Sequence, residues 1–451
     1  MRIVYFDIDC LRPDHLGCYG YRRPTSPAID QIASQGVRFE RYYCSSSPCL
    51  PSRTVWSSGR FGIRNGVISN HGAGAQFHIR QGNYGGPKAD NEMLTRQLRR
   101  GGYDTISFSN FADRHSALWF MCGWSEYHTP NLMCGAETAE QVNAPLMHWL
   151  KHNATRENYL LHVNYWDAHR VFKMDASWAD RFAGMPAPAW PDEPTIAGQQ
   201  DLSGAFTPQH LHWGDGVSQW PLMPDSISGR ADYEHLVTGY DAAIAYVDHH
   251  VAQVLEELDR QGVLEDAAVI ISGDHGDALG EHGIYSDHVC ADECNHHIPL
   301  IVKWPGVTQP GRRDEAMLYN ADLPPTLCEL LGMEAPGDWD GESFAGNLRG
   351  DDRLDREYLV WDCALYAVQR VVRTRQHLLM ETYDDYGYRF EPTELYDMAG
   401  DPYETRNLAA ERPELVSRHR GMLSEWLGEQ MRKPHWRGDP LGEVLRERSQ
   451  Q

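Results

Sequence analysis

The sequence lacks an apolar run long enough to cross a membrane. It is also short of positive charge: 41 Lys and Arg residues oppose 64 Asp and Glu residues in a chain of 451, so the formal net charge at pH 7 is -23. Bulk electrostatics would therefore repel nucleic acid and anionic membranes, and an anionic substrate would need a local cluster of positive side chains. We expect neither nucleic acid nor a membrane among the partners.

Cysteine is sparse as well. Ten cysteines scattered through the chain do not make a dense disulfide framework, which is typical of a reducing compartment. The N-terminal residues enter an apolar run directly, without the successive regions of a signal peptide. We expect a cytoplasmic protein, or a periplasmic one if a leader was removed. The hydrophobic share of 41% suits a globular chain with one large α/β domain and a smaller one.

One short motif stands out in the first part of the chain: Cys49 is followed by Pro51, Ser52 and Arg53, just ahead of an expected helix. The N–H groups at a helix N-terminus favour negative charge, whether on a nucleophile or on the group that it attacks. The motif therefore indicates a site for anionic ester chemistry. A buried or loop cysteine beside a turn proline is the plain alternative.

Apolar runs that end in polar residues provide candidate metal ligands. The run from Ile3 to Ile8 ends at Asp9, and the run from Ala267 to Gly273 ends at Asp274 and His275. Such runs are typical of buried parallel strands, and open α/β sheets place ligands at the carboxyl ends of their strands. We therefore predict that Asp9, Asp274 and His275 bind a metal ion.

The Cys49 motif resembles the signature of type I sulfatases, members of the alkaline phosphatase superfamily whose cysteine is oxidised to formylglycine after translation. The segments around Asp9 and Asp274 resemble sulfatase segments too, and the resemblance covers essentially the whole chain. It implies an α/β fold with a large mixed, mostly parallel sheet flanked by helices, and a smaller C-terminal antiparallel sheet with a helix. We place the catalytic domain at residues 1–345 and the C-terminal α+β subdomain at residues 346–451.

The resemblance implies catalytic roles for Cys49, Arg53, His169 and His288. In the family, one hydroxyl of hydrated formylglycine attacks sulfur and expels the alcohol. A histidine then helps the second hydroxyl to lose its proton, and elimination of sulfate restores the aldehyde. Cys49 would be the precursor and Arg53 would hold the nucleophile. His169 matches a histidine that faces the sulfate, although a surface loop histidine is an alternative. His288 replaces a lysine, and would donate a proton nearer neutrality.

Asn70, Asn110 and His115 are candidates for binding the substrate. Asn70 lies about where relatives of phosphonate monoester hydrolases and choline sulfatases often have an asparagine, but a turn residue beside Gly72 explains it as well. Asn110 stands where many sulfatases have a lysine. His115 or Arg114 could supply the missing charge, and the sequence does not choose between them.

The predicted metal shell departs from the family at one position. Many sulfatases carry two adjacent acids after the first strand, whereas Cys10 follows Asp9 here, so one presumed ligand is missing. Oxygen ligands favour Ca²⁺, and a histidine ligand leaves Mn²⁺ or another divalent cation open. Because a thiol suits a hard cation poorly, Cys49 is more plausible as a precursor, matured by a formylglycine-generating enzyme.

The expected function is hydrolysis of a small anionic sulfate ester, foremost that of a sulfated saccharide. A phosphonate monoester or phosphodiester hydrolase would use much the same site, and a non-catalytic protein that keeps the fold is a third hypothesis. Residues 171–230 are rich in Pro, Trp, Gly and Asp without a clear period, and are predicted to form substrate-binding loops. The sugar, the sulfate position and the oligomeric state stay open.

Overall fold

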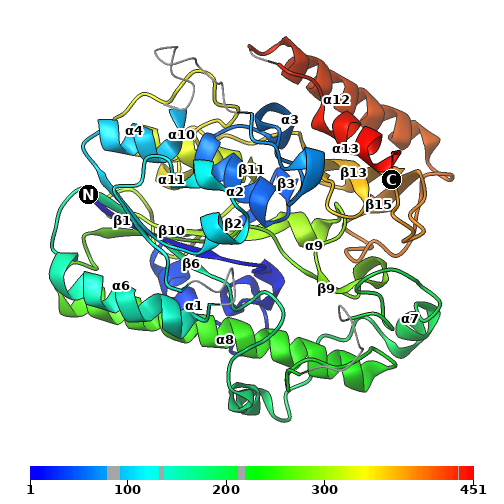
Figure 1. Cartoon of the computed structure of the whole chain (residues 1–451), viewed down its shortest axis with the longest axis horizontal. Coiled ribbons are helices and arrows are strands. Elements are labelled where there is room, and N and C mark those ends of the chain that lie inside the picture. The colour runs from blue at the N-terminus through cyan, green and yellow to red at the C-terminus, as the bar shows by residue number, and fades with distance from the viewer. Residues whose placement is uncertain (79–91, 132–136, 212–218, 435, 451) are drawn as a thin grey trace.

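The computed structural model of the chain describes residues 1–78, 92–131, 137–211, 219–434 and 436–450. The strands of its large sheet are β1 (Arg2–Ile8), β2 (Val37–Tyr43), β4 (Asp104–Phe108), β5 (Glu126–His128), β6 (Tyr159–Tyr165), β7 (Ala267–Gly273), β10 (His297–Lys303) and β11 (Arg312–Tyr319). Their order is β11-β2-β10-β7-β1-β6-β4-β5 (Figure 1). β10 is antiparallel to β2 and β7, and the other neighbouring pairs are parallel. This confirms the predicted large, mostly parallel sheet.

Helices cover both faces of this sheet (Figure 1). One face carries α1 (Pro27–Gln35), α6 (Ala139–Asn153) and α8 (Arg230–Arg260), and the other carries α2 (Cys49–Ser58), α4 (Leu94–Arg100) and α10 (Leu323–Leu330). Strand side chains alternate between faces. The even-numbered apolar residues of β1 join the core under α8, and the odd-numbered Ile3 and Tyr5 join the core under α2. Asp7 and Asp9 continue the odd-numbered face, so both meet α2.

A smaller sheet lies beside the large one, in the order β15-β14-β13-β12-β3. Its C-terminal strands are β12 (Tyr358–Cys363), β13 (Val368–Thr374), β14 (His377–Asp384) and β15 (Thr393–Asp397), followed by α12 (Pro413–Arg432). They pair antiparallel, as predicted. The edge strand β3 (Ser46–Ser47) belongs to the N-terminal part of the chain and pairs parallel with β12. Because β3 directly precedes α2, both sheets position the start of α2; the boundary at residue 345 stays a prediction.

Short elements complete the described chain: β8 (Ala278–Leu279), β9 (Tyr285–Asp287), α3 (Gly62–Asn65), α5 (Phe111–Arg114), α7 (Glu193–Gly198), α9 (Glu293–His296), α11 (Ala345–Arg349), α13 (Pro440–Arg448) and several 3₁₀ turns, among them η3 (Gly72–Gly74) and η6 (Ala176–Phe182). The predicted substrate-binding loops contain η6 and α7. Among the helices in the described ranges, none combines the length and the apolar character that a membrane span needs.

Candidate active site

Cys49 is the first residue of α2, and only 1% of its surface is exposed. Its Sγ lies 3.1 Å from Nε2 of His275 and 3.9 Å from Oδ1 of Asp9. Oδ1 of Asn70 accepts a hydrogen bond of 3.1 Å from the N–H of Leu50, one of the free donors of the first helical turn. The structure thus places the thiol at a helix N-terminus, against two predicted metal ligands and next to Asn70.

The three predicted metal ligands surround this thiol. Asp9, Cys49, Asp274 and His275 each offer one ligand atom, and these atoms lie within 4.8 Å of one another. Nε2 of His275 is 3.3 Å from Oδ2 of Asp274 and 3.8 Å from Oδ1 of Asp9. Nδ1 of His275 lies 2.7 Å from the carbonyl oxygen of Gly276, which accepts its hydrogen and leaves the Nε2 lone pair for a metal. Two carboxylates and an imidazole fit a divalent cation.

Arg53 lies beneath these carboxylates and is 2% exposed. Its Nε and Nη2 donate to the two oxygens of Asp7 at 2.7 and 2.9 Å, and its Nη1 donates to Asp9 at 2.9 Å and to Asp274 at 2.6 Å. Burial alone would raise the carboxyl pKa values, but the Arg53 charge lowers the pKa of Asp7 and Asp9. Burial prevails at Asp274 and raises its pKa. Arg53 therefore holds the acids around Cys49.

Asp7 was absent from the predicted site. Its carboxylate nevertheless accepts two of the hydrogen bonds that hold the Arg53 guanidinium. Its Oδ2 also lies 3.1 Å from Nε2 of the buried His162 on the neighbouring strand. The period of two along a strand is the signal that could have found it, since Asp7 and Asp9 must share a face.

His169 and His288 approach the thiol together: Cys49, His169 and His288 form a second group of ligand atoms within 4.8 Å of one another. Nδ1 of His288 lies 3.5 Å from Oδ1 of Asp277. Burial lowers the pKa of His288, but the charges of Asp287 and Asp277 outweigh burial and raise it to about 9. At neutral pH His288 is therefore a cation, in the place where the resemblance leads one to expect a lysine.

Asn110, Arg114 and His115 all follow β4, but the structure gives them different charges and different contacts. The amide nitrogen of Asn110 donates to Oε2 of Glu137 at 3.2 Å, so this side chain contacts the partner of Arg114. His115 is uncharged, because burial and the Arg114 charge lower its pKa well below the usual value. Arg114, in contrast, brings its Nη1 to 3.5 Å from Oδ2 of Asp9. Of these three residues, Arg114 is therefore the one that places a positive charge beside Asp9, a predicted metal ligand.

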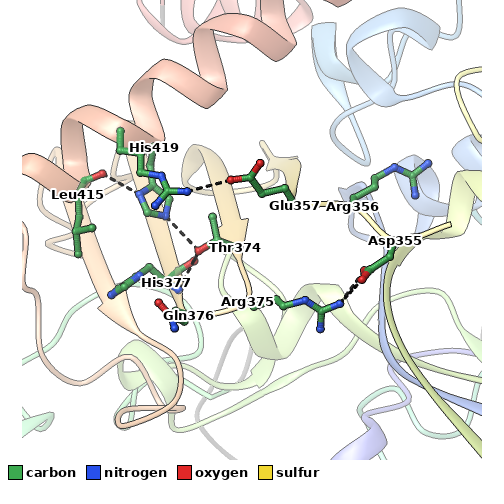
Figure 2. Close-up of a pocket in the computed structure, with 10 residues that line it drawn as sticks. Asp355, Arg356, Glu357, Thr374, Arg375, Gln376, His377, Leu415 and His419 are labelled. Carbon is green, nitrogen blue, oxygen red and sulfur yellow. Dashed lines mark hydrogen bonds and ion pairs between the residues drawn. The ribbon is translucent and has the colours of Figure 1, made fainter. Parts of the chain in front are cut away.

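A separate pocket of about 430 Å³ lies between the small sheet and α12 (Figure 2). Two of its three arginines are paired within it: Arg375 binds Asp355 at 2.6 Å and Arg418 binds Glu357 at 2.9 Å. The third, Arg356, binds Asp322 at 2.7 Å. The predicted site residues are all described, and they lie outside its lining. The cluster around Cys49 is therefore the candidate active site.

The chain matches two protein-family models and is similar to several curated proteins. The family model described as Sulfatase matches residues 2–333, and the model described as N-sulphoglucosamine sulphohydrolase, C-terminal, matches residues 280–429. The chain is similar to an N-acetylglucosamine-6-O-sulfatase of Bacteroides thetaiotaomicron, with 23% identity over 90% of this chain and 82% of that protein. It is also similar to a Delta 4,5-hexuronate-2-O-sulfatase of the same organism, with 24% identity over 92% and 87% of the two chains.

Solved structures share the fold. One holds its substrate D-glucosamine-2-N,6-O-disulfate and superimposes with a TM-score of 0.76 at 18% identity, over 94% of this chain and 97% of that one. The phosphonate monoester hydrolase of Agrobacterium radiobacter has a TM-score of 0.72 at 19% identity, over 95% of each chain. These identities establish the fold alone, whereas the Sulfatase model spans most of the sequence, including Cys49 and the predicted metal ligands. The chain belongs to the sulfatase family of the alkaline phosphatase superfamily.

Proposed function

We propose that the chain hydrolyses sulfate esters of carbohydrates, with a nucleophile derived from Cys49 and a divalent cation held by Asp9, Asp274 and His275. The observation that carries the proposal is the Cys49 thiol at a helix N-terminus, 3.1 Å from Nε2 of His275 and within the same group of ligand atoms as two carboxylates. A thiol is a poor ligand for a hard cation, whereas the oxygens of a hydrated aldehyde suit it. Oxidation of Cys49 to formylglycine by a maturation enzyme removes this mismatch.

The donor set fits Ca²⁺ or Mn²⁺: carboxylate oxygens suit both, and the imidazole of His275 favours the transition metal. When bound, the cation supplies Lewis-acid stabilisation of the oxygens around sulfur and of the nucleophile. Arg53 contributes from the protein side, because its donors hold Asp9 and Asp274 in position and its charge keeps Asp9 ionised.

His288 acts as the general acid of the reaction and His169 as the general base. His288 is charged at neutral pH, with a pKa of about 9, and can donate a proton to the oxygen of the departing alcohol. His169 lies in the same group of atoms as Cys49 and His288, so it can accept the proton that leaves the nucleophile. Asn70 holds the N–H of Leu50 and so fixes the first turn of α2 beside the reacting group.

The proposed substrate class rests on charge and on the relatives. Arg53 already serves Asp7, Asp9 and Asp274, so in a chain of net charge -23 the attraction for a small anionic ester would come from Arg114, His288 and the bound cation. Curated relatives are named for sulfated glucosamine and hexuronate, and one structural neighbour holds a glucosamine disulfate. A sulfated saccharide is therefore the proposed substrate.

A phosphonate monoester hydrolase is the second candidate function. The hydrolase from Agrobacterium radiobacter matches the fold as well as several sulfatases do, with a TM-score of 0.72. Sulfate and phosphonate monoesters both offer a tetrahedral centre with anionic oxygens, so the same cations and metal ligands serve either reaction. Only parallel assays on both ester types separate them.

The test is co-expression of the full chain with a formylglycine-generating enzyme, followed by the mass of the peptide that contains position 49. The matured protein is then assayed on sulfated mono- and oligosaccharides and on phosphonate monoesters. We expect formylglycine at position 49, turnover of a sulfated saccharide, and loss of turnover in Cys49→Ala. Cys328→Ala is the matched control, because Cys328 is a buried cysteine of α10 in the apolar core. Full activity in Cys49→Ala refutes the proposal, and an unmodified thiol without turnover favours a binding protein.

A further inference from the structure

Trp166 follows β6 and lies between two side chains of the active site. The guanidinium carbon of Arg114 stands 3.7 Å from the centre of the indole ring, and the ring of His169 stacks on the indole with 3.8 Å between centroids and 18° between planes. Stacked planar groups in van der Waals contact need about 3.5 Å between them. If Arg114 and His169 lay on the same face of the indole, both so near its centre, they would overlap with each other. They therefore lie on opposite faces of Trp166.

Both sides of this stack are anchored. Nη2 of Arg114 binds Oε1 of Glu137 at 2.6 Å, and Glu137 is fully buried. Asp167 directly follows Trp166, and its buried carboxylate accepts a hydrogen bond from the N–H of Ala139, at the start of α6. The indole therefore stands on a loop tied to α6, while Arg114 is held by a carboxylate from the segment just before α6. Trp166 therefore holds the side chains of Arg114 and His169 apart at a fixed spacing.

The stacked Arg114 keeps hydrogen-bond donors without a strong acceptor, and one of them lies close to Asp9. The Nε atom of Arg114 is buried and has no hydrogen-bond partner among the described residues, and its Nη1 makes only the 3.5 Å contact with Asp9. A buried donor without an acceptor is costly, and a planar guanidinium suits an oxyanion through paired hydrogen bonds. On the other face, His169 reaches Cys49 and His288 within 4.8 Å. Arg114 and His169 thus approach the space beside Cys49 from the two faces of Trp166.

We propose that Trp166 is a positioning residue that sets the spacing of Arg114 and His169, and that Arg114 binds the sulfate group of the substrate. This inference rests on the proposed function, adds Trp166 to its site and gives Arg114 a direct contact with the substrate. It accounts for the charge that Asn110 does not supply: a guanidinium from α5, over an indole from the loop after β6, brings that charge close to Asp9.

The first experiment measures binding of inorganic sulfate to the full-length, metal-loaded protein by calorimetry, together with kcat and KM on a hydrolysed ester. Trp166→Leu should weaken sulfate binding about tenfold and lower kcat more than it raises KM, while Trp166→Phe, which keeps a smaller platform, should stay within about threefold. Trp149→Leu is the matched control. Trp149 is also a buried tryptophan near an arginine, Arg156 at 5.9 Å, but it packs on Tyr159 at the start of β6, the end of that strand opposite Trp166. This variant should leave all three quantities unchanged.

A second pair of variants tests Arg114 itself. The double variant Arg114→Gln with Glu137→Gln removes both charges together, so no lone carboxylate stays buried, and should weaken sulfate binding about tenfold or more. Arg114→Lys keeps the charge without the planar fork and should recover part of the affinity. Unfolding temperatures establish that each variant is folded. If Trp166→Leu does not fold, Trp166→Phe and the double variant decide.

The outcomes separate the inference from the proposed function. If no ester is hydrolysed but sulfate binding still falls in the Trp166 and Arg114 variants, the anion site stands and the proposed function fails. If esters are hydrolysed while folded variants bind sulfate and turn over like the wild type, the inference is overturned and the function stands. Equal losses in Trp149→Leu also overturn the inference, because they would reflect the general packing energy of a buried tryptophan.

Discussion

Replacement of Arg53 by Gln removes a buried cation that donates hydrogen bonds to Asp7, Asp9 and Asp274. Removal of one partner from a buried ion pair costs about 3–5 kcal/mol, because the remaining charge is left without compensation. Here three acids share one arginine, and protonation of Asp274, whose pKa burial already raises, limits the added repulsion. We therefore expect Arg53→Gln to lower the free energy of unfolding by about 3–5 kcal/mol.

The assay is urea denaturation at pH 7, followed by circular dichroism, first with a chelator and then with a saturating divalent cation. A cation at 100 times its dissociation constant adds about 2.7 kcal/mol of stability to any protein that binds it only when folded. At one fixed cation concentration the gain should be larger in Arg53→Gln than in the wild type, because the variant binds the cation more tightly when no guanidinium neutralises Asp9 and Asp274.

The control is Arg373→Gln. Arg373 is also buried and donates to one carboxylate, Glu293, at 2.7 Å, so its loss should destabilise the protein without changing the effect of the metal. Arg53→Lys keeps a charge and should lose less than Arg53→Gln. An unfolding free energy of Arg53→Gln within about 1 kcal/mol of the wild type, below the 3–5 kcal/mol expected of a broken buried pair, would refute the reasoning.

Three further predictions concern metal, pH and the C-terminal helix. Removal of the bound cation with a chelator should lower the unfolding temperature in calorimetry, because metal-facing carboxylates are left in a buried site; an unchanged temperature contradicts a metal there. His282 is buried, which lowers its pKa, but Glu404 at 3.1 Å raises it to about 9. This folded pKa exceeds the unfolded value, so the stabilisation, up to about 3 kcal/mol, is complete below about pH 6.5 and is lost as the pH rises through about 9. His282→Gln should flatten the pH dependence of urea stability in that window, and an unaltered profile contradicts the assignment. Asp439→Ala removes the N-cap of α13 and the 2.7 Å partner of buried Arg370, so it should cost about 2–4 kcal/mol and expose the C-terminus to limited proteolysis; resistance equal to that of the wild type argues against this anchor.

The family resemblance carried the prediction of the fold, and apolar patterns located individual strands and one long helix within it. The repeat from Tyr233 to Leu258 predicts a helix that the structure extends to Arg230–Arg260, and the apolar runs before Asp9 and Asp274 are central strands. The helices α6 and α13 have weak local signals in the sequence. α6 contains Pro145, which usually ends a helix, and α13 is short and largely polar.

The sequence by itself determined the family and the large sheet, and it predicted which side chains gather at the edge of that sheet. The Cys49 motif and the strand-end acids are local patterns, and parallel strands must bring their carboxyl ends together. Local pattern could not choose between Asn110, Arg114 and His115, since all three follow the same strand.

Only the tertiary structure decided how these side chains face one another. Arg53 meets Asp7 and Asp9 because one face of β1 packs against α2, and Arg114, whose guanidinium lies over the indole of Trp166, reaches Asp9. Each of these contacts joins distant elements of the chain across a packed layer. Their geometry depends on the direction of each side chain within that packing, which spacing along the sequence does not encode.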